Sequence, residues 1–525
     1  MEPNLPNFER SLLPTLDAAF DTWAQQPCLN FAGEVLTYRQ VGDASAQIAN
    51  QLIAGGFKPG DKGSVYSLNS AWSFVATLGI LRAGGTWIPI NPRNSEADNV
   101  AILRQFGSDA VFFQAAFADP VKEFVSDKTQ VVCLNDRVAQ WPPLSAWMAG
   151  ANSMPPEVEV QPTDLVTIPL TGGTTGLPKG VMLSHRNFCA LEYATRKMYG
   201  KRAPIVMCVA PMTHVGGRIA VCGLSSGAQF VILEAVDPQL VLQTIQDHKI
   251  TDTFLPPTGV YSLLDQPNLD QFDLSSLCSF SYGSAPMATE RLKEALERIG
   301  PVMRGGFGQT ECPMFIARLQ PSEHFLNDDP QCDIASDTRL RSVGRSTIIS
   351  TIGIVDEAGC ELPAGERGEI AVKGPMVSEG YYEAPEETAK IRVNGWHLTG
   401  DIGYLDEDGY LYVVDRKKDM IITGGFNVYS TEVEQGLMAL EGVQLAVVFG
   451  VPDDKWGEAV AAHVKLEPNA QLDAIEIMQR AKASLGGVKA PKQVTLVEDF
   501  PRTPVGKIDK KKLREAAWAH TSRTI

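Results

Sequence analysis

Strand-like and helix-like segments alternate through the first half of this chain. Residues 62–68 and 86–90 are short apolar runs typical of buried strands, whereas residues 44–54 and 71–84 have helical periodicity. Parallel strands must be joined by crossover connections, which are usually helices. The pattern therefore predicts a doubly wound α/β fold. The same rhythm recurs further along, at residues 111–113, 131–134, 205–224 and 230–247.

The pattern changes twice in the second half of the chain. Short strands with turn residues between them, such as 368–373 and 409–414, predict a small β-rich subdomain, and helices and strands return after the charged run 415–419. We therefore expect residues 1–414 to form a large N-terminal region of two doubly wound α/β subdomains plus a small β-barrel-like subdomain. Residues 415–525 are expected to form a smaller α+β C-terminal domain.

Composition excludes several classes of protein. With 525 residues, of which 44% are hydrophobic and 21% charged, the chain can bury more than one large core. A net charge of −16 argues against nucleic acid as a partner. The nine cysteines form no CxxC pair, and we find no signal peptide and no apolar run long enough to span a bilayer. A cytoplasmic protein without integral membrane association is expected.

A loop rich in glycine and threonine joins two of the predicted strands. It runs from Thr171 to Gly180, and the strand-like residues 165–170 and 181–183 flank it. Glycines let backbone N–H groups turn toward an anion, and threonine hydroxyls and Lys179 add further donors. A Walker A loop requires glycine before its lysine and Ser or Thr after it, whereas Lys179 lies between proline and glycine. The loop predicts ATP binding outside the P-loop class.

Five further motifs follow in the chain. They are Tyr282-Gly283-Ser284-Ala285-Pro286, Gly306-Phe307-Gly308-Gln309-Thr310-Glu311, Gly395-Trp396-His397-Leu398-Thr399-Gly400-Asp401, Asp415-Arg416-Lys417-Lys418-Asp419 and Pro504-Val505-Gly506-Lys507-Ile508-Asp509. Together with the glycine/threonine loop, and in this order, they resemble the motifs of the adenylate-forming superfamily. That superfamily includes acyl- and aryl-CoA synthetases, nonribosomal adenylation domains and luciferases. The resemblance covers nearly the whole chain.

The resemblance implies a two-step reaction. A carboxylate attacks the α-phosphorus of ATP, pyrophosphate leaves, and the thiol of coenzyme A then attacks the acyl-adenylate. Lys507 is placed as the catalytic lysine that bridges the carboxylate and the α-phosphate, since a cation must offset the repulsion between two anions. Glu311 is placed as the ligand of Mg²⁺, and Thr310 as a donor to the α-phosphate. The expected enzyme is an AMP-forming acid–thiol ligase.

The resemblance also implies the remaining contacts to the nucleotide. Asp401 is expected to accept the ribose hydroxyls, with Arg416 as a further ribose or phosphate contact. Phe307 stands where relatives commonly have tyrosine beside the adenine, a change that keeps ring stacking. The full predicted ATP/AMP-binding set is Thr171, Gly172, Gly173, Thr174, Thr175, Gly176, Lys179, Gly283, Ser284, Ala285, Pro286, Gly306, Phe307, Gly308, Gln309, Thr310, Asp401 and Arg416.

The acyl pocket implied by the resemblance comprises His214, Gly216, Tyr282 and Gly305. His214 corresponds to a histidine near the acyl carboxylate and the pantetheine path, and we expect it to orient or gate rather than to transfer a proton. The two glycines are expected to leave room for a bulky group. An aromatic or a medium- to long-chain aliphatic acid is therefore favoured over acetate.

For the second step, the resemblance implies that the C-terminal domain rotates about Lys418. This rotation would withdraw Lys507 and present Gly424 and Gly425 to the pantetheine channel, with Asn427 and Trp456 as neighbours. Two positions depart from the common pattern. Gly172 replaces a serine, which is expected to alter phosphate contacts; Ser430 replaces a proline, which is expected to matter little.

Alternatives remain for the acceptor and for the class of protein. A carrier protein or a luciferase-like oxygenation is an alternative to coenzyme A, although no carrier domain is attached. The pattern Gly223-Leu224-Ser225-Ser226-Gly227 suits a serine hydrolase, but that nucleophile needs a strand before it and a helix after it, the reverse of the order expected here. A non-catalytic ATP-binding protein is the third alternative. A homodimer is one assembly that the sequence leaves open.

Overall fold

The computed structural model divides the chain into two compact units. The large unit comprises Met1–Ile352 and Val372–Gly395, and the small unit comprises Gly353–Ala371 and Trp396–Ile525. The structure describes residues 5–138, 141–171, 178–453, 455–502 and 508–518. Residues 396–414 thus group with the terminal segment, and a functional boundary at residue 415 stays a prediction.

The first sheet of the large unit is nine-stranded within the described residues, with the order β16-β15-β14-β13-β12-β10-β11-β1-β2. Its central strands, from β14 to β1, are parallel, and antiparallel strands flank them at both edges. The strands are β1 (Pro27–Phe31), β2 (Glu34–Thr37), β10 (Ile205–Cys208), β11 (Gln229–Ile232), β12 (Asp252–Leu255), β13 (Ser279–Gly283), β14 (Met303–Gln309), β15 (Cys312–Leu319) and β16 (Arg345–Ser346).

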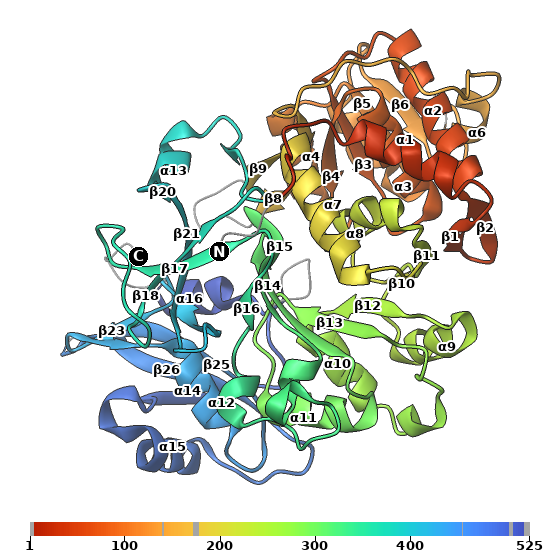
Figure 1. Cartoon of the computed structure of the whole chain (residues 1–525). Helices are drawn as coiled ribbons and strands as arrows, with labels where there is room; N and C mark the ends of the chain where they lie inside the picture. Colours follow the sequence, from red (N-terminus) through yellow and green to blue (C-terminus); the bar gives the residue numbers. More distant parts are fainter. Residues whose placement is uncertain (1–4, 139–140, 172–177, 454, 503–507, 519–525) are drawn as a thin grey trace. The chain divides into compact units, whose positions relative to one another are not determined.

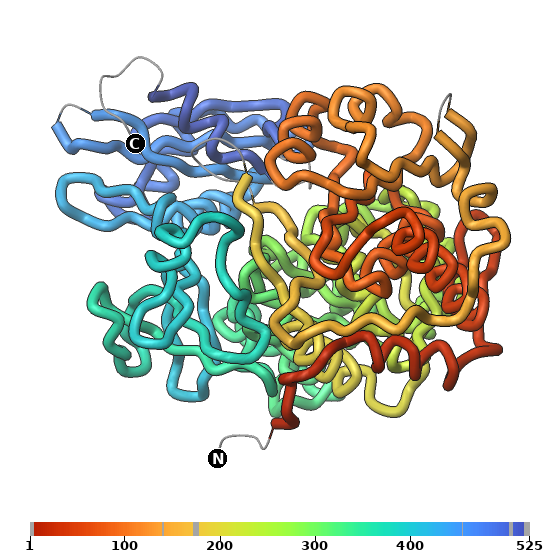
Figure 2. The backbone as a smooth tube through the Cα atoms, turned by 90° about the horizontal axis from the view of Figure 1, so that it is seen from above, coloured from red at the N-terminus to blue at the C-terminus, as the bar shows by residue number. Residues whose placement is uncertain are grey.

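The second sheet of the large unit has the order β19-β9-β7-β4-β3-β5-β6, and β8 pairs with β9. Strands β3 to β7 are parallel to one another, whereas β9 runs antiparallel to β7, β8 and β19. The strands are β3 (Lys62–Tyr66), β4 (Thr86–Ile90), β5 (Ala110–Phe113), β6 (Gln130–Cys133), β7 (Leu165–Thr167), β8 (Leu170–Thr171), β9 (Lys179–Ser184) and β19 (Gly380–Tyr381). Figure 2 shows the red and orange chain of this sheet gathered in one region.

Local sequence signals start the helices of the large unit. Thr37 and Gln40 form a reciprocal capping box at the start of α2, and Ser70 accepts from the backbone N–H of Ser73 at the start of α3. Helix α3 is buried along its whole length, as expected for a helix that is apolar on all sides. The helices include α1 (Leu13–Thr22), α2 (Tyr38–Ala54), α3 (Ala71–Arg82), α4 (Glu96–Phe106), α5 (Ala118–Phe124), α6 (Leu144–Trp147), α7 (His185–Tyr199), α8 (Val215–Gly223), α9 (Pro238–His248), α10 (Pro257–Leu264), α11 (Thr289–Arg298), α12 (Asp337–Leu340) and α13 (Pro385–Lys390).

The small unit contains two groups of strands. In the first, β17 (Thr351–Val355), β18 (Gly368–Lys373) and β21 (Trp396–Leu405) are neighbours, and β22 (Leu411–Arg416) pairs with β21. The second sheet has the order β24-β23-β26-β25, with β27 on β26. Its elements are β23 (Ile421–Thr423), β24 (Phe426–Val428), β25 (Val443–Asp453), β26 (Gly457–Leu466), β27 (Gln493–Leu496), α14 (Ser430–Met438), α15 (Ala474–Lys489) and α16 (Lys510–Trp518).

The predicted fold class is confirmed. Helices α9, α10 and α11 follow strands β11, β12 and β13 in the doubly wound manner, and Figure 1 shows them beside this sheet. In the terminal segment, helices α14 and α15 pack their apolar faces on the sheet through residues such as Val433, Val448 and Ile477. Within the described residues, no helix has both the length and the apolar character needed to cross a bilayer.

Candidate active site

Several predicted site residues follow the carboxyl ends of parallel strands in the nine-stranded sheet. His214 comes after β10, Ser284 directly follows β13, and Glu311 comes after β14. Because β10, β12, β13 and β14 are parallel, their carboxyl ends lie at one edge of the sheet. This edge is where open α/β sheets usually bind ligands. The fold thus gathers the predicted acyl and nucleotide segments of the large unit.

Two glycines allow β13 and β14 to approach each other at this edge. Gly283 is opposite Gly306, and a Cβ on Gly283 would lie 2.4 Å from the carbonyl oxygen of Gly306. The following residue, Ser284, has a φ of +70°, a left-handed conformation that residues other than glycine rarely adopt. Such strain is often found at functional sites. Residues 283–286 and 306–308 therefore start from adjacent strands, as a shared nucleotide site requires.

Glu311, the predicted metal ligand, is buried and has a defined partner. The hydroxyl of Tyr381 donates a hydrogen bond to its Oε1 at 2.7 Å, and the backbone N–H of Ser378 donates to its carbonyl oxygen at 2.8 Å. Burial, with the negative charge of Glu311 as the next cause, raises the pKa of Tyr381. The Tyr381 hydroxyl therefore stays protonated and remains a donor. One carboxylate oxygen is held, which orients the group.

Strands are observed on both sides of the glycine/threonine segment, as predicted: β7 and β8 precede it and β9 follows it. Thr171 in β8 is opposite Lys179 in β9, and the Thr171 hydroxyl lies 3.4 Å from the carbonyl oxygen of Lys179. The ammonium group of Lys179 forms an ion pair with Glu387 in α13 and lies 5.2 Å from the ring centre of Tyr381. Lys179, followed by Lys390, lowers the pKa of Glu387 to about 2. Lys179 is thus already bound to an anion.

Part of the predicted set lies outside the described residues. This part contains Gly172, Gly173, Thr174, Thr175 and Gly176 of the loop, together with the predicted catalytic Lys507. The residues on either side of the 503–507 segment are paired, because Arg502 and Ile508 form an antiparallel bridge. The assignment of Lys507 stays a prediction.

Tyr282 and Gly305, two of the predicted acyl-pocket residues, are neighbours on β13 and β14. The hydroxyl of Tyr282 bonds to Nε2 of His324 at 3.0 Å. His324 Nδ1 lies 2.9 Å from the carbonyl oxygen of Gln320, so Nδ1 carries the proton and Nε2 accepts from Tyr282. Burial lowers the pKa of His324 to about 4, which keeps the ring neutral. The hydroxyl of Tyr282 is therefore hydrogen-bonded within the core.

The two glycines of the predicted acyl pocket do not leave open space at their Cβ positions. A Cβ on Gly216 would lie 2.4 Å from the carbonyl oxygen of Ala210, and a Cβ on Gly305 would lie 3.1 Å from both Leu319 and the Tyr282 hydroxyl. Glycine is needed here for close packing. The missing side chain at Gly216 therefore opens no space, whereas the room expected at Gly305 and the place of both residues in the acyl pocket stay predictions.

His214 precedes α8 and is half-buried. Its Nδ1 lies 3.4 Å from Nη2 of Arg218, one helical turn further on. Arg218 is buried, and burial lowers its pKa to about 10, with Cys222 and Glu311 as opposing influences. Nε and Nη1 of Arg218 have no hydrogen-bond partner in the described part of the chain. Arg218 lies within a run of apolar and small residues, so no motif in the sequence marks it as a site residue.

In the small unit, the two predicted ribose contacts face each other across a strand pair. Asp401 in β21 is opposite Arg416 in β22, and Asp401 Oδ1 lies 3.6 Å from Arg416 Nε. Asp401 is buried, whereas the Arg416 side chain is 56% exposed. The arginine can therefore move while the carboxylate stays in place. Their joint contact with a ribose stays a prediction.

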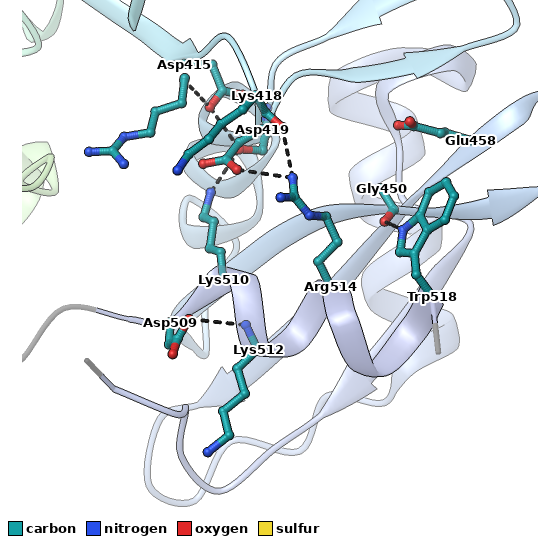
Figure 3. Close-up of polar contacts among 12 residues, drawn as sticks. Asp415, Lys418, Asp419, Gly450, Glu458, Asp509, Lys510, Lys512, Arg514 and Trp518 are labelled. Carbon is teal, nitrogen blue, oxygen red and sulfur yellow. Dashed lines mark hydrogen bonds and ion pairs between the residues drawn. The ribbon is translucent and has the colours of Figure 1, made fainter. Parts of the chain in front are cut away.

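The predicted hinge segment is held by helix α16, as Figure 3 shows. Arg514 donates from Nη1 to the carbonyl oxygen of Lys418 at 2.9 Å and lies 3.4 Å from Asp419. Lys510 bonds to Ser430 at 2.9 Å and forms an ion pair with Glu434 at 2.7 Å. The helix that follows Lys507 in sequence is thus tied to the residues around Lys418.

Asp415 and Ser430 link the end of β22 to the start of α14. The buried carboxylate of Asp415 accepts hydrogen bonds from the backbone N–H of Ser430 and, at 3.1 Å, from its hydroxyl. Proline could supply neither donor. The expectation that serine in place of proline matters little is therefore wrong in structural terms, because here the serine anchors Asp415.

Gly424 and Gly425 form the two-residue turn between β23 and β24. Their φ values are +57° and +83°, which a tight hairpin of this kind requires and glycine provides readily. A Cβ on Gly424 would lie 2.6 Å from the ring of Trp456, and the Gly424 N–H donates to the Trp456 carbonyl oxygen at 2.8 Å. Trp456 is therefore a neighbour of Gly424, as expected. Contact with pantetheine stays a prediction.

The hydrolase alternative is not supported. The segment Leu224–Ser226 is a 3-10 helix that continues α8, and β11 follows it. The Ser225 hydroxyl donates to Glu192 at 2.6 Å. A nucleophile elbow needs a strand before the serine and a helix after it, and this order is reversed here.

The geometry of the large unit defines an α/β protein with a candidate anion and metal site at the carboxyl edge of its sheet. Comparison with known proteins gives its family. The AMP-binding enzyme family matches residues 16–382, and the AMP-binding enzyme C-terminal domain matches residues 432–507. The chain belongs to the AMP-binding enzyme family, and the resemblance to the adenylate-forming superfamily is confirmed.

The names of similar proteins give different acids as their substrates. A medium/long-chain-fatty-acid–CoA ligase of Mycobacterium tuberculosis is 33% identical, covering 95% of this chain and 89% of the relative. A feruloyl-CoA synthase of Amycolatopsis is 30% identical, covering 92% and 94%. The crystal structure of ATP-bound MatB from Rhodopseudomonas palustris has a TM-score of 0.87 at 28% identity, covering 97% and 99%.

Proposed function

We propose that this chain is an ATP-dependent carboxylic acid–CoA ligase that forms an acyl-adenylate, releases pyrophosphate and then forms an acyl-CoA thioester. The observation that carries the proposal is the gathering of His214, the 283–286 segment and Glu311 at one sheet edge of an AMP-binding enzyme. Free coenzyme A as the acceptor and a cytoplasmic location belong to the same proposal.

The charges of the large unit suit the first step. Lys179 supplies a cation at the base of the glycine/threonine loop, where it already binds the carboxylate of Glu387. A polyphosphate would present stronger and more numerous acceptors to this lysine. Lys507 would neutralise the reacting carboxylate and the α-phosphate as they approach. Thr310, which lies just before Glu311, would donate to the same phosphate.

Glu311 fits a Mg²⁺ ligand. Mg²⁺ in nucleotide sites usually takes one or two carboxylates and completes its shell with phosphate oxygens and water. Tyr381 holds Oε1 of Glu311 at 2.7 Å and leaves Oε2 for a cation. When bound, Mg²⁺ would neutralise phosphate charge during the release of pyrophosphate. The described residues contain no cluster of three or more metal-ligating side chains, so the nucleotide itself would complete the site.

The acid is proposed to be aromatic or a medium- to long-chain aliphatic acid. The support is the chemistry named for the relatives, which includes fatty acids and ferulate. The close packing at Gly216 and Gly305 offers no further support. In the second step, rotation about Lys418 would bring Gly424 and Gly425 to the thiol, so that one domain would serve two half-reactions.

The test is pyrophosphate release with ATP and Mg²⁺ across a panel of aromatic and aliphatic acids, each with and without coenzyme A. Thioester products are identified by mass. Acid-dependent release with thioester formation is the expected result, and the relative kcat/KM values rank the acids. The Glu311→Gln variant should lose release, because it removes the metal-binding charge.

Three outcomes would change the proposal. Acid-dependent release without thioester would point to another acceptor, such as a carrier protein or oxygen. No release with any acid, while ATP still binds, would favour a non-catalytic nucleotide-binding protein. Thioester formed without ATP would contradict the adenylate route altogether.

A further inference from the structure

Arg218 is a buried charged group of the large unit that the proposed function does not use. Its side chain is 5% exposed, and its pKa of about 10, lowered by burial, keeps it cationic at neutral pH. A buried charge with few partners costs several kcal/mol. Among the described residues, two of its three nitrogens have no acceptor. The arginine is therefore poorly explained by its contribution to stability.

The third nitrogen, Nη2, bonds to Nδ1 of His214 at 3.4 Å. A guanidinium group has only donors, whereas a neutral imidazole has one donor and one acceptor nitrogen. Nδ1 of His214 must therefore be the acceptor. In this arrangement the ring carries its proton on Nε2. The contact with Arg218 thus selects one tautomer and one orientation of the ring.

The spacing of the two residues, one at the N-cap of α8 and one within it, constrains this contact geometrically. His214 is the residue before the helix, and Arg218 lies four positions later, on the same face. Burial lowers the pKa of the guanidinium, and the nearby carboxylate of Glu311 opposes this effect. The close packing of Gly216 against Ala210 holds the first turn in place.

We propose that Arg218 is a positioning residue that holds His214 as an Nε2–H donor directed to the acyl group. This inference rests on the proposed function, in which His214 lies beside the acyl carboxylate. A fixed N–H donor stabilises negative charge on a carbonyl oxygen, and such charge develops when the thiolate attacks the acyl-adenylate carbon and AMP leaves. A donor in the wrong tautomer would instead present a lone pair to that oxygen.

The first test is the tautomer itself. The full-length protein is labelled with ¹⁵N-histidine, and the spectrum of a His214→Asn variant assigns the His214 signals among the seven histidines. The wild type should show Nδ1 as the unprotonated nitrogen and Nε2 as the protonated one. Arg218→Met, which removes the donors and keeps an unbranched chain, should show mixed tautomers. Arg218→Lys, which keeps a donor, should restore the wild-type pattern in part.

The second test separates the steps of the reaction. Thioester formation from preformed acyl-adenylate is measured in single turnover with the same variants. We expect Arg218→Met to lower this rate about tenfold or more, while the KM for the acid changes less than about twofold. Arg218→Lys should recover part of the rate. A merely structural role would lower the rate, raise the KM for the acid and lower thermal stability together. It would leave the tautomer of His214 unchanged.

The inference is overturned if His214 is protonated on Nδ1 in the wild type, or if Arg218→Met leaves its spectrum unaltered. If Arg218→Met does not fold, Arg218→Gln replaces it; its shorter side chain does not bring a donor to the position of Nη2, so it should also show mixed tautomers. The tautomer is read without substrate. If the tautomer is as expected but the protein makes no thioester, the result contradicts the proposed function and leaves the contact between His214 and Arg218 supported.

Discussion

Replacing Tyr282 with phenylalanine removes one hydroxyl from the core beneath the candidate site. The hydroxyl donates to His324 Nε2 at 3.0 Å, and both residues are buried. His324 cannot turn to another partner, because its Nδ1–H is held by the Gln320 carbonyl oxygen. The variant therefore leaves a buried acceptor without a donor, which costs about 1–3 kcal/mol. We expect the free energy of unfolding of the large unit to fall by that amount.

The assay is equilibrium unfolding in urea, followed by intrinsic fluorescence, for the wild type and the Tyr282→Phe variant. Tyr193→Phe is the matched control, since Tyr193 is half-buried and its hydroxyl has no hydrogen bond within the described ranges. The control should change stability by less than about 0.5 kcal/mol. The KM for the acid in ATP–pyrophosphate exchange should stay within about twofold, because the hydroxyl is bound to His324.

A loss no larger than that of Tyr193→Phe would refute the assigned hydrogen bond. A tenfold rise in KM for the acid with unchanged stability would show instead that the Tyr282 hydroxyl serves the substrate. The two readouts thus separate a core residue from a residue that contacts the acyl group.

Three further predictions concern charge and pH. Lys507→Ala should nearly abolish adenylation and largely spare transfer from a preformed acyl-adenylate in single-turnover assays; equal losses in both would contradict its assignment. Glu387→Gln frees Lys179 from its carboxylate partner and should lower the KM for ATP about two- to fivefold, as steady-state kinetics would show; a higher KM would mean that Glu387 assists binding. Burial lowers the pKa values of His185 and His324 to about 4, below the unfolded value of about 6.5. The unfolded chain therefore binds more protons below pH 6.5, and stability should fall as pH falls, by about 1.4 kcal/mol per histidine at pH 5.5 relative to pH 7.5. Urea midpoints that do not change over this range would contradict it.

Much of the fold follows from local patterns. Residues 86–90 and 368–373 form strands with the bounds that their composition indicates, and the helix expected at 71–84 ends two residues earlier, at Arg82. These segments have strong periodicity and clear turn residues at their ends. The helix expected from residue 44 begins at Tyr38, because the capping box at Thr37 starts it and Tyr38 and Val41 of its first turn are already buried.

The candidate site was less predictable, because its support comes from distant parts of the chain. Tyr381 and Glu387 belong to no motif, yet they contact Glu311 and Lys179 through the pairing of β19 with β9. Arg218 was hidden because its neighbours in sequence are apolar and small. Such contacts depend on strand pairing and burial rather than on spacing, so one sequence alone does not reveal them.

For the glycines, the sequence alone does not show whether a missing side chain opens space or allows close packing. The sequence shows that Gly216 has no side chain, but whether this leaves space or allows close packing depends on the neighbouring backbone. The carbonyl oxygen of Ala210 occupies the position in question. The Gly424-Gly425 pair favours a hairpin turn, but the pair alone does not fix a positive φ at both residues.

The hydrogen bond from Arg514 to the carbonyl oxygen of Lys418 gives helix α16 the properties of a mechanical latch. Backbone rotation at Lys418 would carry this oxygen away, so the latch must open or travel with it. A hydrogen bond to a charged donor stabilises by about 1.5–3 kcal/mol, which is small enough for thermal opening and large enough to lengthen the dwell time in each orientation. If the C-terminal domain turns about Lys418, helix α16 is a timing element for that turn.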